Sequence, residues 1–318
     1  MAGLIPEGMP GGLRYGRKLR KLLRVAALLG AGASSLTCAD PLDLCTPKKA
    51  RFDFFSKGDC MLTRASFFQG HEWLTWFGNQ DLPANDRFTD AEISTIAEGN
   101  RRVDWPKELL FHMNNGILAY ISALTEHTEE PKNQRLHFLL TDRNSTAEAA
   151  AEAQAEVRRL TVEAMRAWIT NRIWSLTLMG KAQHLIQDAY SEAHSRREPL
   201  HPTRPFCVVK VKAFIERAPG YDTPDVEYHS DDDDDSVGHT TTKDSIYRTG
   251  RDCHEPVGAA AVEGCLSDSA LRARAASADH LRVLRRLIGN QVFNQADLEQ
   301  AVDAELQPFI QEHLALCP

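Results

Sequence analysis

The sequence predicts an all-α protein of several helices with one short irregular or β insertion around residues 205–238. Three observations support this fold class. From residue 71 onward, apolar residues recur at intervals of three and four, as the buried face of a helix requires. Residues that cap helices begin several of these segments. In contrast, the stretch 200–250 combines a β-branched run with Pro-, Gly- and Asp-rich sequence.

The first 39 residues have the composition of a targeting segment. Six basic residues between Arg14 and Arg24 precede an apolar run at 25–33, and small residues follow up to Ala39. This order is typical of a secretory signal, and the run is too short to span a bilayer. A basic amphipathic or disordered tail is the alternative. We expect a signal or targeting segment at 1–39, a single helical domain at 40–318, and a secreted, periplasmic or extracellular location.

Cysteine usage agrees with export. Removal of Cys38 with the signal leaves six cysteines, enough for three disulfides whose pairing the sequence does not determine. They are Cys45, Cys60, Cys207, Cys253, Cys265 and Cys317. None forms a Cys-x-x-Cys pair, which disfavours a thiolate zinc site. Six reduced core thiols in a cytosolic protein are the alternative.

The first predicted helices begin at caps or at proline. Thr89 and the acidic residues after it open a helix through Ala97. Pro106 stands near the first position of another helix, which runs from Trp105 to about Leu124. Ahead of these helices, residues 40–70 have an irregular pattern.

The strongest helical block covers residues 145–192. Ser145 or Thr146 can cap it, and Gly180 is expected to bend or interrupt it. Its predicted buried face consists of Met165, Trp168, Ile169, Ile173, Leu176 and Met179.

The last third of the chain contains the insertion and two more helices. The β-branched run 206–211 predicts a short strand, and the stretch 218–238, with its five consecutive aspartates, predicts a loop. Helices are expected at 271–287 and, after an Asn294 cap, at 296–306.

The segment from His184 to His194 carries the strongest chemical signal. His184 and Asp188 are four residues apart, so on a helix both side chains project from one face. Imidazole nitrogen and carboxylate oxygen bind zinc at about 2.0–2.2 Å. Asp188 could bridge two metals through its two oxygens, and His194, beyond the helix end, could reach a second ion. A surface pair of His184 and Asp188 is the alternative.

Two earlier segments add ligand candidates. His71 follows a glycine in an aromatic stretch, and Asp104 and His112 are eight residues apart on either side of a predicted helix start. An ordinary capping role for Asp104 and a core position for His112 are the alternatives. Together with the later segment, these residues form the ligand set of a polynuclear zinc site with oxygen and nitrogen donors.

With the pattern His-x3-Asp-x5-His at 184–194, the chain resembles the zinc-dependent phospholipases C and the related zinc-dependent single-strand nucleases. The resemblance covers about residues 70–245 and is closer to the phospholipase C branch. It implies an all-helical catalytic domain with two to three Zn2+ ions in a cleft. Asp104, His112, His184 and Asp188 would hold one zinc. His71 and Asp188 would hold another, so that Asp188 would bridge the two ions.

The third ion of the family would use His194 with a later histidine and acid. The pairs His239 with Asp244 and His229 with Asp233 both remain candidates. The sequence also departs from the family pattern. The family completes the His71-type site with an N-terminal Trp, whereas the first Trp here is Trp73. The interval from Asp104 to His112 is also shorter than usual.

The resemblance implies phosphodiester hydrolysis, most specifically release of a phosphorylated head group from a glycerophospholipid at a membrane surface. Asp104 is the candidate catalytic residue, as metal ligand and proton acceptor. Trp73, Trp76 and Phe77 could contact lipid or belong to the core. The alternatives are a single-strand nuclease or nucleotidase and a non-catalytic helical interaction protein.

Charge bears on this choice. The first 39 residues carry a net charge of +5, which leaves −12 for the rest because the whole chain carries −7. An acidic body disfavours non-specific binding of nucleic acid. No protein partner is implied.

Overall fold

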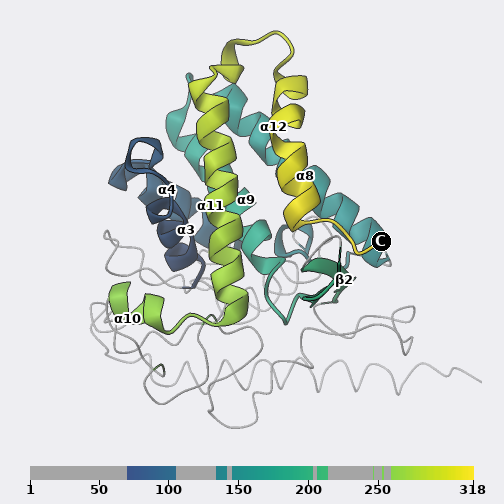
Figure 1. Cartoon of the computed structure of the whole chain (residues 1–318). Coiled ribbons are helices and arrows are strands. Elements are labelled where there is room, and N and C mark those ends of the chain that lie inside the picture. The colour runs from purple at the N-terminus through teal and green to yellow at the C-terminus, as the bar shows by residue number, and fades with distance from the viewer. Residues whose placement is uncertain are drawn as a thin grey trace, which may run out of the picture. The chain divides into compact units, whose positions relative to one another are not determined.

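The computed structural model describes residues 70–104, 134–141, 145–202, 206–213, 246, 253 and 259–318. Most of these residues are helical, in agreement with the predicted class (Figure 1). The helices are α3 (Gly70–Gln80), α4 (Asp90–Asp104), α8 (Thr146–Ala167), α9 (Arg172–Asp188), α10 (Ala259–Gly264), α11 (Asp268–Gly289) and α12 (Leu298–His313). Short 3-10 turns are η4 (Ala84–Asp86), η5 (Arg135–His137) and η8 (Val292–Asn294).

Several expectations concern residues outside this description. They are the segment 1–39 and the start of the domain at 40, the helix from Trp105 to about Leu124, and the loop 218–238. The candidate ligands His112, His229, Asp233, His239 and Asp244 lie outside the described residues as well.

Side-chain caps fix where the helices begin. Ser145 accepts a hydrogen bond from the amide of Glu148, whose carboxylate accepts one from the Ser145 amide at 2.7 Å, so α8 begins with a capping box. The Thr89 amide likewise donates to Glu92 at 3.0 Å before α4. Both starts agree with the sequence. Helix α4 continues past the predicted end at Ala97 and carries Asp104 as its last residue.

The block predicted at 145–192 is two helices, and the break lies at a different place from the one predicted. Asn171 accepts a hydrogen bond from the amide of Trp174 at 3.1 Å and starts α9 anew, while Gly180 lies inside α9 without interrupting it. The predicted buried face fails at this turn, where Ile169 is 67% exposed and Ile173 is 73% exposed. A local cap therefore overrides the apolar periodicity.

Helix α9 is the central element of the described fold. It contacts α3, α4, α8 and α11, and nearly all of its residues from Ser175 to Asp188 are buried. Trp73 and Phe77 lie in the core between α3 and its neighbours. Of the two roles considered for these aromatic residues, lipid contact or core packing, the structure shows core packing. No helix in the described ranges is long and apolar enough to cross a membrane.

Glycine allows α4 and α9 to approach each other at the backbone. A Cβ on Gly180 would meet the carbonyl oxygen of Ile96 and lie 2.6 Å from the amide nitrogen of Asn100. A Cβ on Gly99 would in turn meet the backbone of Thr177. Both contacts are with backbone atoms, which cannot rotate out of the way as a side chain can. The helices can therefore lie this close only with glycine at these positions.

We expect Gly180→Ala to destabilise the protein by about 1–3 kcal/mol, the usual cost of overpacking a core. The added methyl group must push α4 away from α9, and Asp104 at the end of α4 would move with it. Thermal unfolding monitored by circular dichroism measures the loss. Gly289→Ala is the control, because a Cβ there meets nothing within 4 Å. Equal melting temperatures for the two variants would contradict this packing.

A small antiparallel sheet follows α9. Strand β1 (Ser195–Glu198) pairs with β2 (Cys207–Val211), with an irregularity between Arg196 and Arg197. The predicted strand at 206–211 is confirmed, whereas β1 was not predicted. After β2, the Lys212 amide donates to the carbonyl of His194 at 2.9 Å, and the Lys212 carbonyl accepts from the Leu140 amide at 2.8 Å. The sheet thus joins two loops that carry histidines.

The described residues contain two disulfides, Cys207–Cys317 and Cys253–Cys265. The first connects β2 to the C-terminal segment, where Val208 pairs with Leu316. Disulfides of this kind are typical of an oxidising, extracellular compartment. Cys45 and Cys60 lie outside the described residues.

Candidate metal centre

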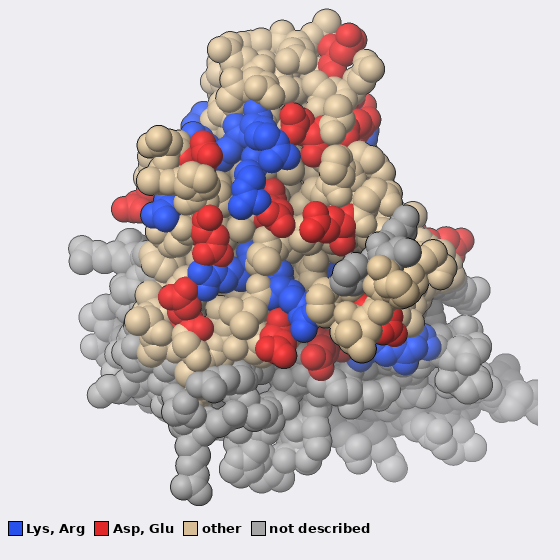
Figure 2. Space-filling model, viewed as in Figure 1, with Lys and Arg blue, Asp and Glu red and all other residues tan. Residues whose placement is uncertain are grey.

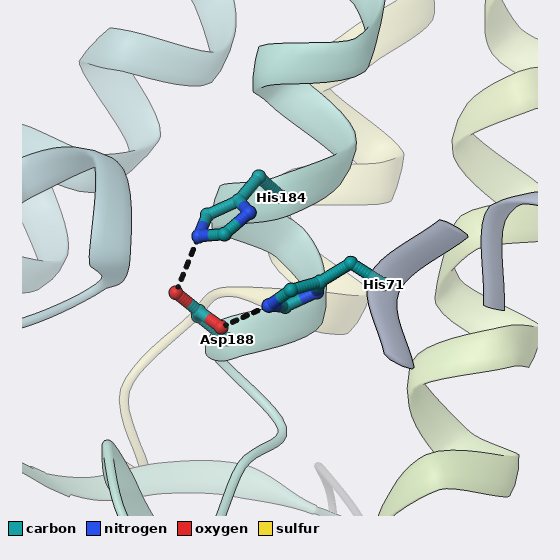
Figure 3. A group of neighbouring side chains, drawn as sticks. All are labelled: His71, His184 and Asp188. Carbon is teal, nitrogen blue, oxygen red and sulfur yellow. Dashed lines mark ion pairs between the residues drawn. The ribbon is translucent and has the colours of Figure 1, made fainter. Parts of the chain in front are cut away.

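Asp188 is the last residue of α9 and is wholly buried. A histidine faces each of its two carboxylate oxygens. Oδ1 lies 3.1 Å from His71 Nε2, and Oδ2 lies 3.0 Å from His184 Nε2. Figure 3 shows the two imidazole rings on different sides of the carboxylate, each facing its own oxygen. Asp188 therefore presents one carboxylate oxygen to each of two histidines.

Further candidate ligands lie on the Oδ2 side. His137 Nδ1 lies 3.2 Å from Asp188 Oδ2 and 3.0 Å from His184 Nε2. Asp104 Oδ1 lies 3.4 Å from His184 Nε2 and 3.7 Å from His137 Nδ1. Two carboxylates and two imidazoles thus converge at one point, and the group of Asp104, His137 and His184 is compact enough to hold an ion. His71, His184 and Asp188 form a second such group.

Each side chain is placed by the end or the face of an element. The four-residue spacing on α9 puts His184 and Asp188 on one face, as predicted. His71 lies in the first turn of α3, and Asp104 is the last residue of α4. His137 ends η5, and His194 lies in the turn after α9. Five separate segments therefore meet around Asp188.

His194 takes a different position from the other histidines. Its Nδ1 lies 3.6 Å from Asp188 Oδ2 but 2.5 Å from the backbone carbonyl of His137. Because a carbonyl only accepts, His194 Nδ1 must carry the hydrogen in this contact. A bond from His194 to a metal would therefore use Nε2, which agrees with a role on a separate ion rather than on the pair around Asp188.

The structure brings together five of the ligands expected from the sequence: His71, Asp104, His184, Asp188 and His194. His137 is a site residue that the sequence analysis missed. Its signal in the sequence is a histidine inside the apolar run from Leu136 to Leu140, whereas the prediction used the histidine nearest to Asp104 in sequence. His112, which was assigned that place, lies outside the described residues.

Burial and the two aspartates set the charge states of the site. Burial lowers the pKa of His184 to about 3, against the attraction of Asp188, so this ring is neutral at pH 7. Burial is also the largest single effect on His71 and lowers its pKa, but the attraction and hydrogen bond of Asp188, together with Asp104 and Gln187, outweigh it and raise the pKa to about 9. Burial raises the pKa of Asp188, yet His194, His184 and His71 hold it well below its usual range. Asp188 is therefore ionised.

These residues fit a divalent cation by their chemistry. Imidazole nitrogen and carboxylate oxygen are the donors that zinc accepts, and a bound cation would replace the proton on His71. Within the described part of the chain, Asp188 Oδ1 is a buried oxygen without a hydrogen bond of good geometry, and its charged neighbour is His71 Nε2 at 3.1 Å. A buried carboxylate oxygen of this kind is costly unless a cation or a donor satisfies it.

A third group, Asp279, Glu312 and His313, has metal-ligand residue types but a different environment. Tyr190 Oη lies 2.7 Å from His313 Nδ1, and Asp279 Oδ2 lies 3.1 Å from His313 Nε2. Both ring nitrogens are thus used in hydrogen bonds. We interpret this group as a structural link between α11 and α12.

Fold and site together define a helical protein with a buried candidate metal centre of histidine and aspartate ligands. Comparison with known proteins adds no family: no protein-family model, no curated protein and no solved structure matches this chain.

Proposed function

We propose that this protein is a zinc-dependent hydrolase of phosphodiesters, and most specifically a phospholipase C that releases a phosphorylated head group from glycerophospholipids. The observation that supports it best is the position of Asp188. Its two oxygens face different histidines, and Asp104 and His137 gather beside one of them. This is the arrangement that two neighbouring cations with a shared carboxylate require.

In this proposal Asp104, His137, His184 and Asp188 hold one zinc, and His71 and Asp188 hold another. Zinc supplies Lewis acidity and lowers the pKa of a bound water toward about 7. The chain itself contributes two buried carboxylates, since Asp188 is wholly buried and Asp104 is only 6% exposed. Asp104 is the candidate residue to accept a proton, because it is the more exposed of the two carboxylates.

Charge supports a lipid over a nucleic acid. The chain has a net charge of −7, and on the face seen in Figure 2 the Lys and Arg side chains lie beside Asp and Glu. On α11, for example, Arg274 pairs with Asp81 at 2.6 Å and Arg286 with Glu305 at 2.7 Å. Alternating charges of this kind do not form the continuous basic track that non-specific nucleic-acid binding uses.

Parallel assays separate the two substrate classes. Phosphatidylcholine vesicles and single-stranded DNA are incubated with the zinc-loaded full chain, and release of phosphocholine and of nucleotides is measured. The proposal expects turnover of the lipid, lost in His137→Ala, which serves as the inactive control. Cleavage of DNA alone would favour the nuclease alternative. Wild-type protein that binds less than one equivalent of zinc and acts on neither substrate would favour a non-catalytic helical protein.

A further inference from the structure

Behind the rings of His71 and His184 lies a group of polar side chains that the proposed chemistry does not use. It consists of Thr75 on α3, Asn100 on α4, Gln187 on α9 and Ser277 on α11, and every member is fully buried. We refer to these four residues as the amide network. Four helices thus contribute polar side chains to one enclosed point, where every hydrogen must have a partner.

The direction of each hydrogen bond in the network follows from the hydroxyl of Thr75. Its oxygen lies 2.9 Å from the backbone carbonyl of His71, and because a carbonyl only accepts, the single hydroxyl hydrogen must point there. Asn100 Nδ2 and Gln187 Nε2 each lie 2.9 Å from the same Thr75 oxygen. Both amides must therefore present NH2 to Thr75, since an amide oxygen there would meet a second oxygen with no hydrogen between them.

The amide oxygens consequently face the two imidazoles. Gln187 Oε1 lies 2.7 Å from His71 Nδ1 and also accepts from Asn100 Nδ2 at 3.1 Å. Asn100 Oδ1 lies 2.9 Å from His184 Nδ1. The second hydrogen of Gln187 Nε2 goes to Ser277 Oγ at 2.9 Å. Both amides thus use all of their hydrogens, and an amide oxygen can accept from an imidazole only if Nδ1 carries a hydrogen.

We propose that the Thr75 hydroxyl, acting through the side-chain amides of Asn100 and Gln187, fixes the hydrogen of His71 and His184 on Nδ1, so that both rings offer Nε2 to the metal centre. These three residues are positioning residues, because none of them contacts Asp188 in the hydrogen bonds described. The inference depends on the proposed metal site, because its purpose is to orient ligands of that site. The position of the hydrogen on the His184 ring can nevertheless be measured without metal, where Asp188 Oδ2, 3.0 Å from His184 Nε2, is the competing acceptor.

The first test compares two replacements of Thr75. Thr75→Val removes the hydroxyl at nearly constant volume, and Thr75→Ser keeps it. Long-range 1H–15N correlation spectra of the metal-free full chain report which nitrogen of His184 carries the hydrogen, and His184→Gln assigns the signal. We expect the Nδ1–H form in the wild type and in Thr75→Ser, and a mixture with the Nε2–H form in Thr75→Val. An Nε2–H form in the wild type, or the same spectrum in all three proteins, would overturn the inference.

The second test measures zinc affinity by competition with a chromophoric chelator. Gln187→Met removes the amide behind His71, and we expect affinity to fall by about 10- to 100-fold, the usual effect of losing a partner that orients a metal ligand. Gln183→Met is the matched control, because Gln183 is equally buried on the same helix but its amide nitrogen contacts His280 Nδ1 at 2.9 Å and the Ser277 carbonyl at 3.3 Å instead of the ring of His71. Equal losses in the two variants would mean a merely structural role and would overturn the inference.

The outcomes keep the two proposals apart. Wild-type protein that binds no zinc, yet shows His184 with hydrogen on Nδ1, would refute the zinc hydrolase and leave the positioning role standing. Protein that binds zinc with the same affinity in Thr75→Val, Gln187→Met and the wild type would refute the positioning role alone. If Gln187→Met does not fold, Thr75→Val supplies both measurements, because its side chain differs least in volume from the original.

Discussion

Replacing Asp188 by asparagine is expected to abolish zinc binding and to lower hydrolysis by on the order of a thousandfold or more. The carboxylate faces both His71 and His184, through different oxygens. An asparagine has one oxygen instead of two and no negative charge, so it can neither bridge two cations nor balance them. The metal would stabilise the transition state by several kcal/mol, and losing that stabilisation lowers the rate by about three factors of ten.

The measurement combines zinc content by mass spectrometry with turnover of phosphatidylcholine. Asp279→Asn is the matched control, since Asp279 also contacts a histidine, His313, at 3.1 Å but belongs to the structural group between α11 and α12. We expect the control to retain zinc and activity. Full zinc content and turnover in Asp188→Asn would contradict the assignment. So would a complete loss in Asp279→Asn with a normal melting temperature.

Removal of the Cys207–Cys317 disulfide is expected to cause the largest loss of stability. The bond joins residues 110 positions apart, and a loop of about 100 residues corresponds to about 4.7 kcal/mol in the chain-entropy description. It also holds β2 in place, and β2 leads directly to Lys212, whose backbone bonds the loops of His194 and Leu140. Weakening this end of the sheet would therefore loosen both His194 and the segment that carries His137.

Denaturant unfolding of Cys207→Ala/Cys317→Ala, compared with Cys253→Ala/Cys265→Ala, measures the effect. The second bond closes a separation of only 12 residues, so its removal should cost less, about 3 kcal/mol or below. We expect zinc affinity to fall more in the first double variant than in the second. A smaller loss of stability for the first pair than for the second would contradict the account of how the sheet is held.

Local signals in the sequence predicted much of the fold. Ser145 with Glu148 and Thr89 with Glu92 begin helices as their side-chain chemistry requires. The β-branched run at 206–211 forms a strand. Its partner β1, with the sequence Ser-Arg-Arg-Glu, has no strand pattern of its own, because its pairing with β2 determines it. The break at Asn171 was hidden by an apolar pattern that continued across it.

The candidate site was predictable where its ligands share one helix and not where a loop supplies them. His184 and Asp188 lie on one face of α9, and this follows from their spacing alone. His137 comes from a short turn distant in sequence, and only tertiary packing brings it to Asp104. The direct approach of α4 and α9 depends on Gly99 and Gly180, whose role becomes visible only when the two helices are seen together.

Anomalous diffraction at the zinc absorption edge, from crystals of the wild-type protein, tests the central claim most directly. We predict two peaks, one on each side of the Asp188 carboxylate, the first near His71 and the second among Asp104, His137 and His184. Zinc bound elsewhere with no peak at this cluster, for example only beside Asp279 and His313, would contradict the account.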